Sequence, residues 1–270
     1  MAITTIDGAI AGVQWPRFIT KAVTGTLVAG RPFSLWSLGG NPGAGAYNTA
    51  LNGVVLSSDS AQVTGQIPFT NPVSANTYLA RFQGSATQPG TLILADRLWH
   101  NGGYTITSTS AQNSTTPTFP ARDANGSTNG EGVLLGVEYS AAAGSAAPTF
   151  TISYTNSAGT AGRSATNYFP TANSSIATSF YPISLQAGDT GVRSVQSLTM
   201  SVSQVTGTIN LVAYRPLAAL ELTAAHVPNA IDALTSGFPR LFDGSVPFLI
   251  FIPSTTTASN ITGQVVWTQG

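Results

Sequence analysis

The titratable residues best placed for chemistry are Asp96, Arg97 and His100, which lie within five positions of one another. A carboxylate beside an imidazole could support general acid–base catalysis. Asp96 and Arg97 are adjacent, however, and adjacent side chains in a strand point to opposite faces. His100 is followed by Asn101-Gly102-Gly103, a sequence typical of a turn. The pattern favours a histidine in a surface turn over a catalytic Asp–His pair, and we predict no catalytic residues.

A second group of polar side chains falls in the long segment 109–130 and just after it. Oxygen-bearing side chains alternate along it at Asp123, Asn125, Ser127, Asn129 and Glu131. Hard cations such as calcium bind several oxygen ligands that converge from a tight turn. The EF-hand form fails, because Thr128 occupies its glycine position and Leu134 its final glutamate position. The segment predicts a turn rich in side-chain hydrogen bonds, with a calcium site as the alternative.

Other chemical signatures are missing from the sequence. It has no Cys, two His, ten acidic residues spread thinly and no G-x-S-x-G nucleophile motif. The glycine-rich run 39–45 is not followed by GK[ST] or by a helical pattern, so it indicates a loop rather than a phosphate site. His226 has no partners at metal-ligand spacing. We predict a protein that is not an enzyme and that binds no cofactor.

The composition indicates a surface that is polar but carries little charge. Charged residues are 7% of the chain and the net charge is zero, whereas ordinary soluble domains have about 25% charged residues. The ten basic residues are nine Arg and Lys21, and they are scattered singly, which argues against a nucleic-acid partner. Low charge favours association, so we expect much of the surface to be covered in an assembly. An extracellular β protein with an uncharged surface is the alternative.

The N-terminal sequence MAITTIDGAIAGVQWPRF lacks the basic start and long apolar core of a signal peptide. No apolar run approaches the ~20 residues of a membrane-spanning helix. The sequence therefore predicts synthesis in a cytoplasm and no membrane partner.

Stretches of alternating apolar and polar residues predict the elements that would position these side chains. The clearest is 192–216, where two alternating arms flank Gly207 and predict a β-hairpin that stops at Pro216. Further strands are predicted, with turns between them, at 26–38, 51–56, 77–83, 91–99, 104–108, 132–139, 149–154, 163–169, 180–185, 246–252 and 261–267. Helical hints are confined to LAALEL (217–222) and to a short turn over 229–234 that ends near Gly237.

This pattern predicts an all-β fold: an antiparallel β-sandwich or jelly-roll-like arrangement, forming one large or two packed β units with little helix. We place a boundary between an N-terminal segment and β unit, 1–131, and a β-sandwich unit with C-terminal strands, 132–270. Residues 1–24 could be an arm that packs on a neighbour or a first edge strand. We predict that Trp15, Phe18 and Arg122 contact neighbouring subunits.

Three stretches of the chain resemble proteins of tailed-bacteriophage virions. They are ARDANGSTNGEGVLLGVEYS (121–140), TISYTNSAGTAGRSA (151–165) and DTGVRSVQSLTMSVSQVTGTINLVAYRPLA (189–218). The proteins they resemble are β-rich structural components of the head decoration, minor capsid or neck and tail type, and they bring no catalytic residues to carry over.

The resemblance implies a structural virion protein that acts through contacts with copies of itself and with other virion proteins, the major capsid protein above all. Head decoration, or cement, is the role we favour. A tail, neck or receptor-binding (glycan-binding) protein is the alternative, for which the long polar loops are the supporting feature. A decoration protein would be made in the host cytoplasm and end in the virion.

Overall fold

The computed structural model describes residues 3–144, 146–167 and 175–270. Within these ranges the chain forms seventeen strands and two short helices, α1 (Ile6–Ala11) and α2 (Ala233–Ser236). The strands pair antiparallel in two sheets, which confirms the predicted all-β, sandwich-like fold. No helix in the described ranges is long and apolar enough to cross a bilayer.

The smaller sheet is built around the strand nearest the C-terminus. Its order is β14 (Asn229–Asp232), β5 (Thr77–Ala86), β17 (Ser259–Gln269), β1 (Arg17–Val23) and β3 (Gly40–Asn41), and β15 (Arg240–Leu241) also pairs with β5. β17 pairs with both β5 and β1, so it joins segments that are far apart in the sequence. β1 is therefore not the edge strand that the sequence allowed, because β3 pairs with its other side.

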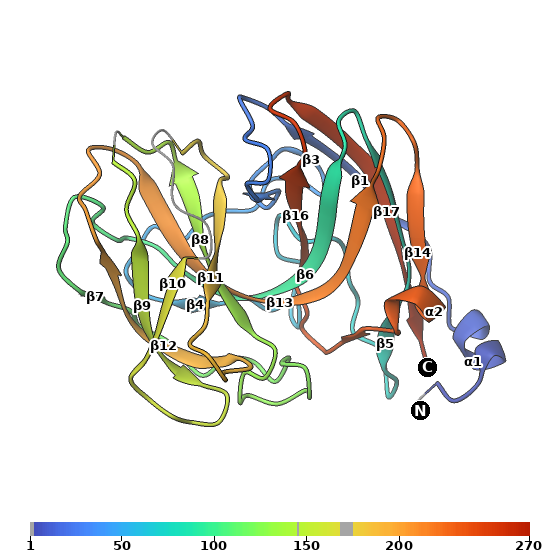
Figure 1. The fold of residues 1–270 in the computed structure, drawn as a ribbon. Coiled ribbons are helices and arrows are strands. Elements are labelled where there is room, and N and C mark those ends of the chain that lie inside the picture. The colour runs from blue at the N-terminus through green and yellow to red at the C-terminus, as the bar shows by residue number, and fades with distance from the viewer. Residues whose placement is uncertain (1–2, 145, 168–174) are drawn as a thin grey trace.

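The molecule has two lobes, one that contains the small sheet and one beyond it, and the larger sheet extends through both (Figure 1). Its order is β2 (Phe33–Ser34), β16 (Pro247–Pro253), β6 (Gly90–Asn101), β13 (Thr208–Leu222), β8 (Leu134–Ala141), β11 (Phe180–Ser184), β10 (Arg163–Asn167), β9 (Phe150–Asn156), β12 (Val192–Met200) and β7 (Gln112–Asn113), and β4 (Val54–Val55) also pairs with β6. The long strands β6 and β13 run through both lobes (Figure 1). We call the region between the lobes, where both strands pass from one lobe to the other, the waist.

Each lobe has its own apolar core. One core lies between β8 on one side and β9 and β12 on the other, and it includes Leu98 and Trp99 from the end of β6. The other core lies under the small sheet and includes Leu92 and Leu94 from the start of the same strand. A third cluster, with Trp36 and Phe248, fills the waist. One pair of long strands thus supplies side chains to both lobes, which ties the lobes into one body.

Alternation in the sequence explains why β8 forms. Val133, Leu135, Val137 and Tyr139 are fully buried, as the period of two predicts. Burying an apolar side chain of this size contributes roughly 1.5–3 kcal/mol. The other face of β8 is also buried, at Gly136 and Glu138. The apolar run in β16 is buried on both faces too, because Leu249 and Phe251 pack in the core under the small sheet, whereas Phe248 and Ile250 pack in the third cluster.

The predicted hairpin over 192–216 is wrong in its pairing, although both strands exist. β12 pairs with β9 and β7, and β13 pairs with β6 and β8. Pro216 does not end the strand either, since β13 continues to Leu222. The register between β13 and β6 shifts between Pro216 and Ala218, and such an irregularity tolerates a residue that has no N–H to donate.

Three local predictions also differ from the structure. LAALEL is strand, not helix, because its apolar positions pair with β6 in the core of the smaller lobe. No strand forms over 104–108, because β6 extends to Asn101 through the expected turn. Only Phe33–Ser34 is strand within 26–38. The short helix predicted over 229–234 is largely wrong, because Asn229–Asp232 is strand β14. α2 begins only at Ala233 and is capped, as predicted, by Gly237, which is in the left-handed conformation.

Residue 131 does not separate the two sheets, because each sheet contains strands from both sides of it. A domain boundary at this position stays a prediction. Of the predicted strand 163–169, residues 168 and 169 lie outside the described residues.

Candidate interaction surface

The waist holds a cluster of buried charges, which we call the waist cluster: Asp96, Arg97, Arg122, Glu138 and Arg215. Arg97 Nη2 donates to Glu138 Oε2 at 2.7 Å, and both side chains are fully buried. The guanidinium of Arg97 also lies 4.7 Å from the ring centroid of Trp36. A buried charge is tolerated when it is paired and hydrogen-bonded, so this pair fixes β6 against β8 across β13.

Asp96 is fully buried and is held by hydrogen bonds within the chain. Its Oδ1 accepts a hydrogen bond from the backbone N–H of Val246 at 2.8 Å, and its Oδ2 accepts one from Ser245 Oγ at 3.1 Å. Arg122 Nε lies 3.6 Å from the same Oδ2. The carboxylate therefore anchors the loop before β16.

His100 is buried in β6, not exposed in a turn as its sequence predicted. A register shift opposite Arg97 and Trp99 interrupts the strand alternation, so Arg97 Nη2 comes within 3.3 Å of His100 Nδ1. Burial, together with the positive charge of Arg97, lowers the pKa of His100 to about 3. Among the described residues Asp96 and His100 form no hydrogen bond with each other, so the structure does not bring the conceivable catalytic pair together.

Arg122 is also buried, which corrects its predicted role as an interface contact. Its guanidinium donates to the carbonyl oxygens of Gly244, Leu56 (2.7 Å) and Arg97 (3.3 Å). The long polar segment suggested a surface position, but the five donors of an arginine can satisfy loop carbonyls that lack strand partners. Arg122 joins three segments inside the chain.

The predicted calcium segment forms a turn around Asp123. The Asp123 carboxylate accepts from the backbone N–H groups of Asn125, Ser127, Gly130 and Glu131 and from Ser127 Oγ. Protein donors thus occupy both oxygens, as in the hydrogen-bonded turn that the sequence favoured. No group of three or more His, Cys, Asp or Glu side chains that could hold a metal occurs within residues 3–144, 146–167 and 175–270. Calcium binding here stays a prediction.

The N-terminal segment lies on the outer face of the small sheet. Thr5 caps α1 by accepting from the Gly8 N–H at 3.0 Å. Ala9 O accepts from Thr268 Oγ1 of β17 at 2.5 Å, and a Cβ on Gly12 would lie 2.1 Å from the carbonyl oxygen of Gln269. Glycine therefore allows the helix to approach the strand closely.

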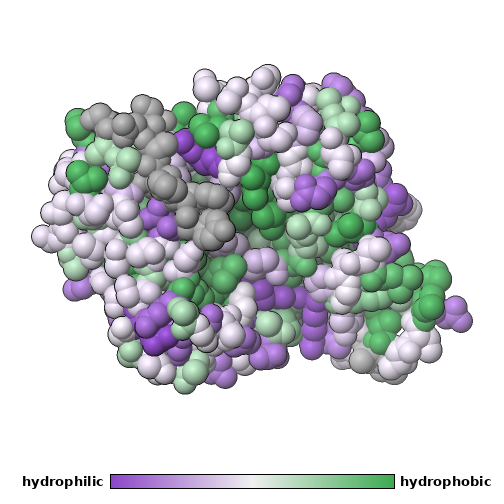
Figure 2. Space-filling view, in the orientation of Figure 1, coloured by the Kyte–Doolittle hydropathy of each residue, from purple (hydrophilic) through white to green (hydrophobic). Residues whose placement is uncertain are grey.

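Large apolar side chains are exposed in α1, in α2 and in the segment from α1 to the start of β1, and we call them the outer patch: Ile6, Ile10, Val13, Trp15, Phe18 and Leu234. Four of them, Ile6, Ile10, Val13 and Leu234, line one hollow. Trp15 is 84% exposed and Phe18 is 63% exposed, and α1 has no buried residue. Hydrophobic atoms gather where Figure 1 places α1 and α2, and a second hydrophobic area lies in the middle of the view, between the lobes (Figure 2). An apolar area of this kind is typical of an interaction site.

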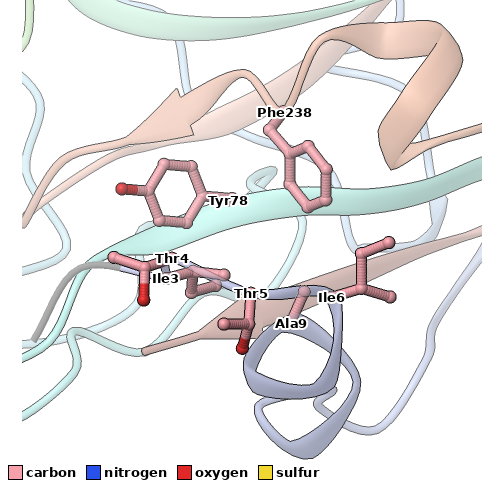
Figure 3. A pocket seen from close by; sticks show the side chains of 7 residues that line it. All are labelled: Ile3, Thr4, Thr5, Ile6, Ala9, Tyr78 and Phe238. Carbon is pink, nitrogen blue, oxygen red and sulfur yellow. The ribbon is translucent and has the colours of Figure 1, made fainter.

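Two adjoining hollows form a groove between α1 and α2. One has a volume of about 320 Å³, the other has a volume of about 260 Å³, and both are lined by Ile6, Ala9 and Phe238. Tyr78 and Phe238 form one wall, with ring centroids 6.3 Å apart, and Ile6 and Ala9 of α1 lie opposite (Figure 3). We call this hollow the α1–α2 groove.

Trp15 and Phe18 were predicted as interface residues, and both are available to a partner. Contact with a neighbour stays a prediction for both. Sequence reasoning missed Ile6, Ile10 and Leu234. The spacing of Ile6 and Ile10, four residues apart, was a signal for an apolar helix face, whereas nothing local to Leu234 indicated that it would face α1.

No family model matches the chain, and no curated protein matches it. Among solved structures, the chain is similar to the infectious bursal disease virus VP2 subviral particle at 10% identity, with 95% of this chain and 81% of that chain covered and a TM-score of 0.22. The structure of the infectious bursal disease virus Gt strain is 9% identical over 95% of this chain and 82% of that one, with a TM-score of 0.18. Similarity at this level carries no argument about fold or function.

Proposed function

We propose that this chain is a structural, non-enzymatic protein of a tailed-bacteriophage virion, and that it decorates the head through protein–protein contacts. Three sequence stretches support the virion setting by their resemblance to phage structural proteins. The outer patch is the observation that carries the contact role, because its six large apolar side chains are exposed and four of them line one hollow.

The distribution of charge adds support. The chain has ten basic and ten acidic residues, and eight of them are buried: Lys21, Arg31, Asp96, Arg97, Arg122, Asp123, Glu138 and Arg215. The surface is therefore even poorer in charge than the composition suggests. A surface with few charges loses little hydration when a neighbour covers it, as suits a protein packed in a shell.

A decoration protein stabilises a shell because it binds the assembled lattice in preference to free subunits, which shifts the equilibrium by mass action. The strands supply a rigid support for this role, and the N-terminal segment presents the contact residues. In this proposal the buried Asp96 and His100 have structural roles.

Purified chain mixed separately with emptied phage heads, isolated tails and host cells tests this function. We expect stoichiometric, saturable binding to heads, measured by co-sedimentation. Binding to host cells with none to heads would overturn the decoration role in favour of the receptor-binding one.

A further inference from the structure

The outer patch contains both a protruding side chain and a hollow. Trp15 is 84% exposed in the segment before β1, two residues after Val13, which lines the α1–α2 groove. We propose that a second copy of this chain docks on the outer face, with the Trp15 of each copy inserted into the α1–α2 groove of the other. This inference deepens the proposed function and takes its setting from it.

The groove has the size and lining to accept an indole ring. The hollow of about 260 Å³ is walled by Ile6, Ile10, Val13, Leu234 and Phe238, with the small side chain of Ala80 at its floor. That volume is room for one large aromatic side chain. An aromatic anchor in an apolar pocket is the common centre of a protein interface.

The groove also offers an acceptor for the indole N–H. Asp232 lines it, and Asp232 Oδ1 accepts from the backbone N–H groups of Leu234 and Thr235 at 3.0 Å each. Within the described part of the chain Oδ2 has no hydrogen-bond partner, so it is open to a donor. A buried indole usually finds such a partner, and this selects tryptophan over phenylalanine.

A second copy fits this face better than a charged partner does. The net charge of the chain is zero, so two copies have no long-range repulsion. Arg81 and Asp232 occupy paired positions on β5 and β14, which leaves the local charge balanced. Two copies related by a two-fold axis can each insert Trp15 into the α1–α2 groove of the other, and this is the commonest symmetry of homo-oligomers.

The exposed area is of the right size. An aromatic side chain presents ~150–250 Å² when fully exposed. The six side chains of the outer patch, each exposed in part, together expose on the order of 700 Å². That area is close to the ~800 Å² that each partner buries in a standard interface. Trp15 and Phe18 supply about half of this area.

Tryptophan fluorescence provides a direct readout of the insertion. The chain has four tryptophans, and Trp36, Trp99 and Trp267 are at most 2% exposed. Acrylamide quenching therefore reports on Trp15. As the concentration rises through the dimerisation range measured by ultracentrifugation, we expect Trp15 to lose its access to the quencher.

Variants on both sides of the contact test the geometry. Trp15→Ala and the groove variant Leu234→Asp should each weaken dimerisation by about 30-fold or more, as loss of a hot-spot residue does. Trp15→Phe should weaken it less, and Val205→Asp should leave it unchanged. Association that survives both Trp15→Ala and Leu234→Asp would overturn the proposal.

The two proposals fail in different ways. A chain that binds heads but stays monomeric, with Trp15 open to the quencher at every concentration, refutes the dimer and leaves the head role standing. A chain that dimerises through Trp15 but ignores heads refutes the decoration role alone.

Discussion

The waist cluster and the outer patch reverse the usual distribution of residue types. Five charged side chains of the waist cluster are buried between the lobes, whereas six large apolar side chains of the outer patch face solvent. Charged residues are rarely buried unless they are paired, and extended apolar surface is rarely left uncovered. Each waist charge has at least one partner within the chain, and the outer patch has its partner, as we infer, outside it.

The difference separates residues that hold the fold from residues that hold an assembly. Waist arginines donate to loop carbonyls and to Glu138, so removing one leaves buried groups unpaired. Outer-patch residues contribute little to the monomer because they are already in water. Substitutions should therefore change unfolding in one region and association in the other.

The largest expected effect is on Glu138. Glu138→Leu leaves Arg97 as an unpaired buried charge, and we expect the free energy of unfolding to fall by about 3–5 kcal/mol. Denaturant titration measures it.

The double variant Arg97→Met/Glu138→Leu removes both charges and is the control. It should regain at least half of the loss, because an apolar pair can replace a buried ion pair. A double variant as unstable as the sum of its singles would contradict the pairing.

A second effect concerns Lys21, the only lysine of the chain, which is buried beneath the loop that contains β3. Its Nζ donates to the carbonyl oxygens of Leu38 at 2.6 Å and Pro42 at 2.7 Å. Lys21→Met leaves these acceptors unpaired and should cost about 2 kcal/mol at pH 7.

The same residue predicts a pH dependence. Burial lowers the pKa of Lys21 from 10.5 to about 8. Between pH 8 and 10.5 the unfolded chain then binds more protons at this site than the folded chain, so the wild type should gain stability relative to Lys21→Met as pH rises through this window. If the free energies of unfolding of the two proteins change with pH in the same way, the lowered pKa of Lys21 is refuted.

A smaller effect is expected at Asp123. Burial opposes ionisation of this carboxyl, but hydrogen bonds from Ser127, Glu131 and Asn125 outweigh it and lower the pKa of Asp123 below 3.8. Asp123→Asn places an amide N–H₂ against backbone donors and should destabilise by about 1–2 kcal/mol above pH 4. Because the pKa of Asp123 is lower in the folded chain than in the unfolded chain, its contribution to stability is lost as the pH falls through the folded-state pKa.

Calcium titration distinguishes the turn from the cation site at the same residue. If hydrogen bonds alone hold the turn, neither CaCl₂ nor EDTA should change the melting temperature of the chain. A calcium-dependent rise in melting temperature that Asp123→Asn abolishes would instead establish the site.

The smallest effect is expected in the outer patch. Phe18→Ala and Ile10→Ala should change the free energy of unfolding of the monomer by no more than about 0.5 kcal/mol, because both side chains are mostly exposed. Calorimetry at a concentration below dimerisation checks this. A loss of several kcal/mol would show that the patch supports its own chain.

Periodicity predicted the fold class and most long strands, because alternation in segments such as 149–154 reflects deeper burial on one face. It failed on pairing. The arms around Gly207 look like a hairpin, but each finds its partners far along the chain. Local sequence carries no information on such pairings, and it also misassigned LAALEL, where tertiary packing overrides helix propensity.

The candidate surface was predictable only in part. Trp15 and Phe18 stood out as aromatics in an irregular segment, whereas the groove needs α1, β5 and α2 brought together. Arg122 and His100 were both placed at the surface because polar neighbours suggested it. The burial of Arg122 depends on carbonyls supplied by segments remote in sequence, such as Leu56 and Gly244, and the contact of His100 with Arg97 depends on a register shift in β6.

The position of β17 between β5 and β1 sets the order of events during synthesis. β1 and β5 emerge from the ribosome early, but neither pairs with the other, and each needs β17 as its neighbour. The small sheet therefore cannot complete its strand pairing until residues 259–269 have been translated. The segment that carries Trp15 packs against β17 only then. Nascent chains thus present no finished contact surface to one another on a polysome, which delays association until each subunit has folded.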